Sequence, residues 1–130
     1  MPAPSDQLTR LASGLPGLRL LVLHGSRARR EAHERSDWDF AYVADRALDP
    51  ERLRLLLIEH LDTDAVDLAD LATAGALLRY RVARDGVRLY EAETGIFERF
   101  RMDAIHTWCD LEPVLTPLYE QVLLDLERAR

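Results

Sequence analysis

The sequence of 130 residues has a single cysteine, Cys109, and it has no long apolar run. One thiol cannot build a disulfide framework or a zinc site, and it suits a reducing compartment such as the cytoplasm. The longest apolar runs, such as Leu55–Ile58, are far shorter than the roughly 20 residues of a membrane-spanning helix. The N-terminus also lacks the apolar segment of a signal peptide. We therefore expect a soluble, cytoplasmic protein with no membrane partner.

Positive charge is in deficit, because 17 basic residues stand against 23 acidic ones and the net charge is −6. General nucleic-acid binding depends on neutralising phosphates, so we expect no direct nucleic-acid partner. Arg27, Arg29, Arg30 and Arg35 nevertheless form a local basic cluster that can bind one small polyanion. Apolar residues make up 48% of the chain, which is enough for the core of one domain over residues 1–130.

The pattern of apolar and turn-forming residues predicts alternating helices and strands. Strands are expected at Leu18–Leu23, Asp37–Val43 and Ala65–Leu68, and a short extended segment at Val87–Tyr90. Helices are expected after Ser5, at Arg27–His33, Glu51–Leu61 and Leu71–Arg84, and from Thr94 almost to the end. Pro113 and Pro117 should break or kink the last helix. The order predicts an α/β (α+β) fold, in which helices flank a small mixed sheet of about three to four strands. The catalytic core would cover about residues 17–91, and a helical C-terminal region about 94–129.

Apolar residues also recur at steps of about three or four in the C-terminal region, from Phe97 to Leu111. This spacing is typical of a helix that packs on its own core, but part of it could instead be a partner surface. The sequence leaves both interpretations open.

Asp37 and Asp39 stand two residues apart on a predicted strand. Such residues point to the same face, about 6.5–7 Å apart along the chain, and their carboxylates repel each other unless a cation lies between them. Carboxylate oxygens suit Mg²⁺, whose coordination is usually completed by water and substrate phosphates. One or two such ions can support a phosphoryl or nucleotidyl transfer.

Gly25 and Ser26 end the first apolar strand, ten residues before the aspartate pair. Glycine allows the backbone to approach an anion closely, and a helix that starts there would point free N–H groups and the Ser26 hydroxyl at that anion. Arg27 and Arg29 could add positive charge. This turn is therefore a candidate phosphate-binding site.

A third carboxylate would complete the site, and Asp67 is the candidate. It lies mid-strand in AVDLADL between apolar residues, where a buried charge needs a partner. It would add a metal ligand or act as the base for an attacking hydroxyl. Asp70 is the competitor, but it is more simply interpreted as the N-cap of the next helix.

The Gly-Ser, ten-residue, Asp-x-Asp spacing in GSRARREAHERSDWD resembles the signature of the DNA polymerase β-like nucleotidyltransferase superfamily. The later segments AVDLADL and RDGVRLYE are similar to the minimal nucleotidyltransferases (MNT domains). Many of these are antitoxins encoded beside a HEPN-domain ribonuclease toxin. The resemblance covers about residues 18–91.

This resemblance implies a nucleotidyltransferase fold and a set of roles. Gly25 and Ser26 would hold the nucleotide triphosphate, Asp37 and Asp39 would bind Mg²⁺, and Asp67 would be the third carboxylate. The implied activity is transfer of AMP from ATP to a tyrosine of the HEPN toxin, with release of pyrophosphate. Members of the family often have glycine after the Ala-Arg of the turn, whereas this chain has Arg30.

Two alternative functions fit the same residues. The chain could neutralise its partner by masking it, with weak or absent chemistry. It could also transfer a nucleotide to a small molecule such as an aminoglycoside. Its length fits this function less well, because such enzymes usually carry a larger second domain.

Overall fold

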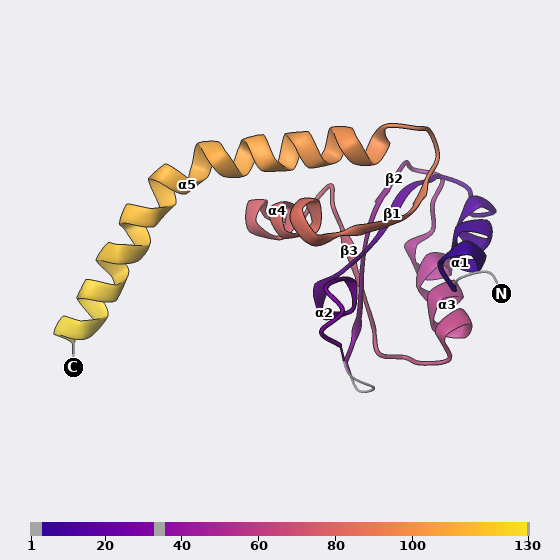
Figure 1. The fold of residues 1–130 in the computed structure, drawn as a ribbon, viewed down its shortest axis with the longest axis horizontal. Helices are drawn as coiled ribbons and strands as arrows, with labels where there is room; N and C mark the ends of the chain where they lie inside the picture. Colours follow the sequence, from indigo (N-terminus) through magenta and orange to yellow (C-terminus); the bar gives the residue numbers. More distant parts are fainter. Residues whose placement is uncertain (1–3, 33–35, 130) are drawn as a thin grey trace.

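The computed structural model describes residues 4–32 and 36–129 (Figure 1). In chain order the elements are α1 (Pro4–Ser13), β1 (Leu18–His24), α2 (Gly25–Ala28), β2 (Trp38–Ala44), α3 (Pro50–Leu61), β3 (Val66–Asp70), α4 (Ala76–Asp85), β4 (Val87–Glu91) and α5 (Ile96–Arg128). The expected end of a helix at His33 and the basic residue Arg35 lie outside the described residues.

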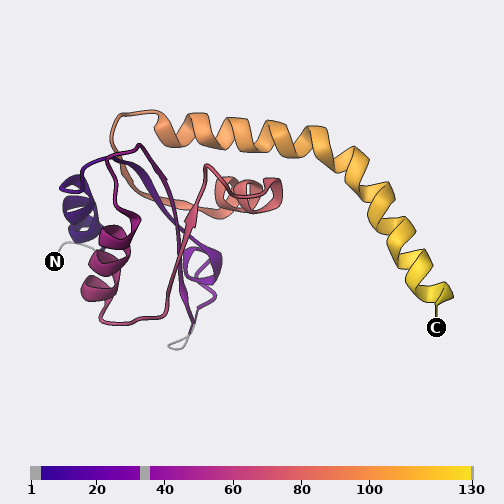
Figure 2. The same ribbon diagram turned by 180° about the vertical axis from the view of Figure 1, so that it is seen from behind.

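The four strands form one mixed sheet in the order β3-β2-β1-β4. Strand β1 pairs antiparallel with β2 and β4, while β2 and β3 are parallel. Helices α1 and α3 cover one face of the sheet, and α4 with the first half of α5 covers the other (Figures 1 and 2). The predicted mixed sheet flanked by helices is confirmed.

Successive side chains of a strand point to opposite faces of the sheet, and helices cover both faces of the central strands, so the side chains on both faces are buried. Leu21 and Phe40 join the core under α1 and α3, whereas Val22 and Ala41 join the core under α4 and α5. All four side chains are fully buried. This double burial fixes the register of β1 and β2, and with it the position of the aspartates on β2.

Helix α3 begins and ends as its sequence predicts. The Asp49 carboxylate accepts a hydrogen bond of 3.0 Å from the N–H of Glu51, and Pro50 occupies the first turn. At the other end, Asp62 adopts the left-handed conformation with φ of 53°. The helix thereby ends just before β3, which carries Asp67.

The predicted start of the following helix at Leu71 was wrong, because α4 begins at Ala76 with Gly75 as its N-cap. Asp70 is the last residue of β3, and its carboxylate accepts a hydrogen bond of 2.9 Å from the N–H of Ala72. Aspartate stabilises such turns by hydrogen-bonding to the backbone two residues on. Asp70 therefore starts a turn, and it is not the helix N-cap that the sequence indicated.

Helix α2 is shorter and earlier than the predicted helix over Arg27–His33. It starts directly at Gly25, and Arg30, just beyond its end, has a positive φ of 59°. A non-glycine residue in this left-handed conformation cannot continue a right-handed helix. The motif turn is thus a single helical turn that follows β1 without a loop.

Helix α5 runs without a break over 33 residues, although it contains Pro113 and Pro117. Of the two predicted outcomes, a break or a kink, the structure shows the kink: Figure 1 shows that the helix axis bends midway along its length, as prolines in a helix commonly cause. The buried residues of α5 all lie in its first half, between Ile96 and Ala104. Within residues 4–32 and 36–129, no helix has the length and apolar character needed to span a membrane.

Candidate active site

Three neighbouring strands bring the candidate residues to one end of the sheet. His24 at the end of β1 lies opposite Asp39 on β2, and Asp39 lies opposite Asp67 on β3. Paired residues of neighbouring strands share a face of the sheet. His24, Asp39 and Asp67 therefore lie side by side on the face that α4 covers, and Asp37 immediately precedes β2.

Gly25 is in direct contact with Asp39. The φ of Gly25 is +72°, and a β-carbon at this position would lie 3.0 Å from Cγ of Asp39 and closer still to its Oδ2 atom. Only glycine combines this conformation with so close an approach. The Gly-Ser turn and the Asp-x-Asp strand, 14 residues apart in sequence from Gly25 to Asp39, thus form two walls of one site.

A cavity of about 270 Å³ opens at this point. Its walls include Asp39, Asp67 and Arg29, and α4 contributes Arg81 and Asp85. A second cavity of about 260 Å³ is lined by Asp37 and Asp67, together with Asp64, Ala65 and Val66. Asp67 lines both cavities, so the three predicted carboxylates border two neighbouring cavities at the sheet end.

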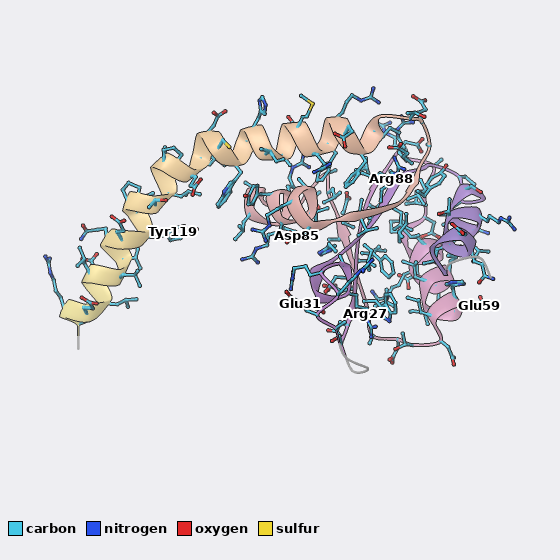
Figure 3. All side chains as sticks on the ribbon, in the orientation of Figure 1. Arg27, Glu31, Glu59, Asp85, Arg88 and Tyr119 are labelled. Atoms are coloured by element: carbon cyan, nitrogen blue, oxygen red, sulfur yellow. The ribbon has the colours of Figure 1, made fainter. Side chains whose placement is uncertain are left out.

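A larger cavity lies elsewhere. It measures about 620 Å³ and lies between α1 and α3, where its lining includes Leu11, Leu55 and Glu59 but none of the predicted site residues. Figure 3 shows Glu59 on α3, well away from Asp85 on α4. Size alone would therefore direct attention away from the carboxylates, and we base the candidate site on its chemistry.

The carboxylates raise the local density of negative charge. Burial raises the pKa of Asp39 above its ordinary value, His24 opposes this rise, and repulsion from Asp67 and Asp37 adds to it. Burial also lowers the pKa of His24, although the charges of Asp39 and Asp67 act in the opposite direction. A cation placed at these carboxylates would relieve the repulsion between them.

The basic residues of the turn are divided between the two faces of the sheet. Arg29 lines the carboxylate cavity and forms an ion pair of 3.1 Å with Glu31. Arg27 instead stacks on Trp38, with its Cζ atom 4.0 Å from the ring centre, and donates a hydrogen bond of 2.8 Å to the Ser36 carbonyl. Trp38 packs against the core under α1 and α3, on the opposite face from Asp39.

Ser26 forms part of the turn itself, since its carbonyl accepts a hydrogen bond of 2.9 Å from the N–H of Glu31. Arg30 is exposed and holds the left-handed conformation described above. Glycine adopts this left-handed conformation without the strain that a side chain causes.

Sequence reasoning did not single out Arg81 and Asp85. They are four residues apart on α4 and thus lie on the same side of that helix, together with Leu78. This spacing was visible in the sequence, but nothing in it indicated that α4 covers the end of β2 and β3. Asp85 also binds Arg84 through two contacts of 3.0 and 2.8 Å, which hold the pKa of its carboxyl below the ordinary value.

Among known families, the model of the polymerase beta nucleotidyltransferases matches residues 6–94. The chain therefore belongs to this nucleotidyltransferase family, as its motif spacing indicated.

Particular relatives are more specific than the family. The protein adenylyltransferase MntA of Aphanizomenon flos-aquae is 28% identical over 135 residues, which cover 92% of this chain and 87% of that protein. The protein adenylyltransferase MntA of Shewanella oneidensis is 36% identical over 83 residues, covering 62% of this chain and 59% of that protein.

Solved structures agree with these relatives. A crystal structure of a toxin–antitoxin with AMP-PNP matches with a TM-score of 0.72 and 29% identity, over 92% of this chain and 96% of that chain. A structure of a tri-AMPylated Shewanella oneidensis HEPN toxin in complex with its MNT antitoxin matches with a TM-score of 0.66 and 28% identity. That match covers 90% of this chain and 91% of the other.

Proposed function

We propose that this chain is a Mg²⁺-dependent protein adenylyltransferase, which transfers AMP from ATP to a tyrosine of a cognate HEPN ribonuclease toxin and thereby neutralises it. The observation that carries the proposal is the contact between Gly25 and Asp39, with Asp67 in register beside it. The relatives named protein adenylyltransferase, the bound ATP analogue in one solved structure and the AMPylated toxin in another support the same reaction.

The oxygen ligands for Mg²⁺ in this proposal are the carboxylates of Asp37, Asp39 and Asp67. The partial burial of Asp39 and its repulsion from Asp67 and Asp37 fit a site for a divalent cation. Within the described part of the chain, no three His, Cys, Asp or Glu side chains form a group that could hold a metal by itself. Phosphate oxygens of ATP would complete the coordination, which is the usual way in which Mg²⁺ is held at such sites. The bound ion would neutralise the charge that develops on the phosphates.

The other residues of the chain would orient the nucleotide and its acceptor. Backbone N–H groups of the Gly25-Ser26 turn would bind the triphosphate, and Arg29 would add positive charge from the wall of the cavity. Arg27 would position the turn through its contact with Trp38. This role differs from the phosphate contact that its sequence position suggested.

The transfer itself forms one bond and breaks one. The oxygen of the acceptor tyrosine attacks the α-phosphorus of ATP, the bond from that phosphorus to the bridging oxygen breaks, and pyrophosphate leaves. Asp67 is the group that we propose to accept the tyrosine proton, because it is exposed and lines both cavities.

Labelled ATP tests this proposal. The chain is incubated with Mg²⁺, its proposed HEPN partner, and ATP labelled at either the α- or the γ-phosphate. We expect the HEPN protein to retain only the α-label, and Asp39→Asn to reduce its labelling by at least about 100-fold. Glu59→Gln is the matched control, since it converts an exposed carboxylate on α3 into an amide far from the site. Retention of the γ-label, or full labelling by Asp39→Asn, would refute the mechanism.

The masking alternative makes a different prediction for the same variants. If complex formation alone neutralises the toxin, Asp37→Asn combined with Asp39→Asn still inhibits its ribonuclease activity. Loss of inhibition in this double variant, at concentrations where the complex still forms, would favour adenylylation. The proposal also assigns the protein to the cytoplasm, the compartment that supplies ATP and Mg²⁺.

A further inference from the structure

The second half of α5 exposes an unusual concentration of large apolar side chains. We name as the distal stripe Leu111, Val114, Leu118, Tyr119, Val122 and Leu126, each of which is at least 38% exposed. Figures 1 and 2 show that this half of the helix extends away from the sheet and the other helices. Monomeric proteins seldom expose so continuous an apolar surface, and such a surface commonly marks an interface.

The distal stripe continues the face by which α5 packs on its own sheet. Phe97, Phe100 and Ala104 are buried in the core beside α4, and Trp108 stacks on Tyr80 with a centroid distance of 5.4 Å. The same spacing of three or four residues leads from Trp108 to Leu111 and on to Leu118 and Val122. One apolar face therefore runs along the whole helix, and the chain covers only its first half.

The bend in α5 turns this face inward. By the 3.6-residue period, Pro113 and Pro117 lie about 180° and about 140° around the helix from Val122, which is near the centre of the distal stripe. A proline ring clashes with the preceding turn and bends a helix away from itself, which places the distal stripe on the concave side. Figure 3 shows the Tyr119 side chain pointing toward this concave side, where the rest of the molecule also lies.

Charge distinguishes between the possible occupants of the distal stripe. Residues 110–129 include five acidic residues and one basic residue. A second copy of this chain would place acidic residues against acidic residues, which disfavours self-association through this face. A partner with an apolar surface rimmed by basic residues would be complementary, and a ribonuclease needs such basic residues to bind RNA.

Similarity to solved structures extends into this helix. The family model ends at residue 94, before α5 begins at Ile96. In contrast, the toxin–antitoxin structure with AMP-PNP matches 92% of this chain, so its likeness must include part of α5. The helix is thus shared with a chain from a toxin–antitoxin complex and does not depend on the family model.

We propose that the distal stripe is the docking surface for the HEPN toxin. The apolar side chains of the stripe would contact an apolar surface of the toxin that is surrounded by basic residues. This inference rests on the proposed function for the identity of the partner. It assigns the two tasks of the protein to different places: α5 binds the toxin, and the carboxylate site modifies it.

Paired charge substitutions test the docking surface. Leu118→Glu combined with Val122→Glu places two charges in the distal stripe, where the two side chains are 58% and 53% exposed. Thr116→Glu combined with Leu124→Glu adds the same charge to the opposite side of the same turns, and both positions are exposed. We expect the affinity for the HEPN protein, measured by titration calorimetry, to fall at least 100-fold in the first variant and less than threefold in the second. Circular dichroism should show unchanged helix content in both variants.

The outcomes separate this inference from the proposed function. Equal toxin affinity in the stripe variant and the wild-type protein would overturn the docking surface, even if the wild-type protein labels the toxin. Dimerisation of the isolated chain that disappears in the stripe variant would also overturn it, because a second copy would then be the occupant. Wild-type protein that binds the toxin through the stripe but never labels it would instead refute the proposed function and leave the docking surface standing.

Discussion

At the scale of single residues, the site depends on how closely a backbone can approach a carboxylate. Gly25 combines a φ of +72° with direct contact to Asp39. A side chain at this position would separate the phosphate-binding turn from the strand that carries the aspartates. The positive φ and the close approach can be tested separately, because Gly95 also has a positive φ but leaves open space among the described residues for an added β-carbon.

Gly25→Ala should destabilise the protein by about 1–2 kcal/mol through the left-handed conformation. It should also reduce adenylylation about 100-fold, since displacement of a catalytic group by about 1 Å has effects of this size. Gly95→Ala is the matched control. Its φ is +100°, but an added β-carbon would meet open space among the described residues. Thermal unfolding and label transfer, measured on both variants, should show lost stability in both and lost activity only in Gly25→Ala. Equal activity in the two variants would contradict the contact that we describe.

Arg30→Gly should stabilise the protein, because Arg30 has a φ of 59° that glycine adopts without strain. Glycine also gives the unfolded chain more entropy, which offsets part of the relieved strain. We therefore expect the free energy of unfolding to rise by about 0.5–1 kcal/mol, or Tm by roughly 2–4 °C. The exposed Arg99 lies inside α5, where glycine should instead cost about 1 kcal/mol. A lower Tm for Arg30→Gly, measured by calorimetry, would show that the arginine side chain makes contributions that outweigh the strain.

At the level of helices and strands, one partly buried carboxylate, that of Glu91, holds the junction between β4 and α5. Glu91 accepts hydrogen bonds from the N–H groups of Gly95 and Phe97, at 3.4 and 3.0 Å, and pairs with Arg88 at 3.0 Å. These donors hold the pKa of Glu91 below its ordinary value, with the bond from Phe97 as the main cause. Glu91 thus stabilises the first turn of the helix that carries the distal stripe.

Glu91→Gln should therefore cost about 1 kcal/mol at neutral pH, a typical value for a lost charged cap. A lowered folded-state pKa means that the stabilisation is present above the unfolded value of 4.5 and is lost as the pH falls below it. Denaturant unfolding at several pH values should show the difference from wild type shrinking in that range. Glu93→Gln is the control, because Glu93 is largely exposed and its contact with Arg19 is long, at 3.9 Å. An exposed ion pair of this kind contributes little to stability. A difference for Glu91→Gln that does not depend on pH would contradict this role.

The elements that the sequence predicted best are those with a local cause. The strands follow short apolar runs, and α3 follows from Asp49, Pro50 and Asp62. The start of α4 was wrong because Asp70 forms a turn with Ala72 instead of capping a helix, and both uses of aspartate have the same local signature. The uninterrupted course of α5 through two prolines could not be deduced from the prolines alone, since a kinked helix and a broken helix share that signal.

In the candidate site, too, the features with a local cause were predictable from the sequence, and those that depend on packing were not. The spacing from Gly25-Ser26 to Asp37 and Asp39 pointed to one site because a family signature preserves it. The contact of Gly25 with Asp39 depends instead on the register of β1 against β2, which is set by cores on both faces of the sheet. Arg81 was missed for a related reason, because its place in the cavity depends on where α4 packs.

At the scale of the whole molecule, the proposed chemistry and the proposed recognition occupy separate regions. The sheet and its covering helices carry the carboxylates, whereas the distal half of α5 extends beyond them with its apolar face uncovered (Figure 1). A toxin held by the helix would raise the effective concentration of its tyrosine at the site. Binding of the toxin by the helix would then increase the rate of its modification, yet mutations could remove either activity without the other.

If the aspartates of this chain direct the attachment of AMP to a tyrosine of the HEPN toxin, the mass of the toxin must increase. Intact mass spectrometry of the toxin is carried out after incubation with ATP, Mg²⁺ and either the wild-type chain or Asp39→Asn. We predict that the toxin becomes heavier by one or more AMP groups only in the wild-type reaction, and that peptide mapping then places the added mass on a tyrosine-containing peptide. An unchanged toxin mass in the wild-type reaction, or the same increase with Asp39→Asn, would contradict it.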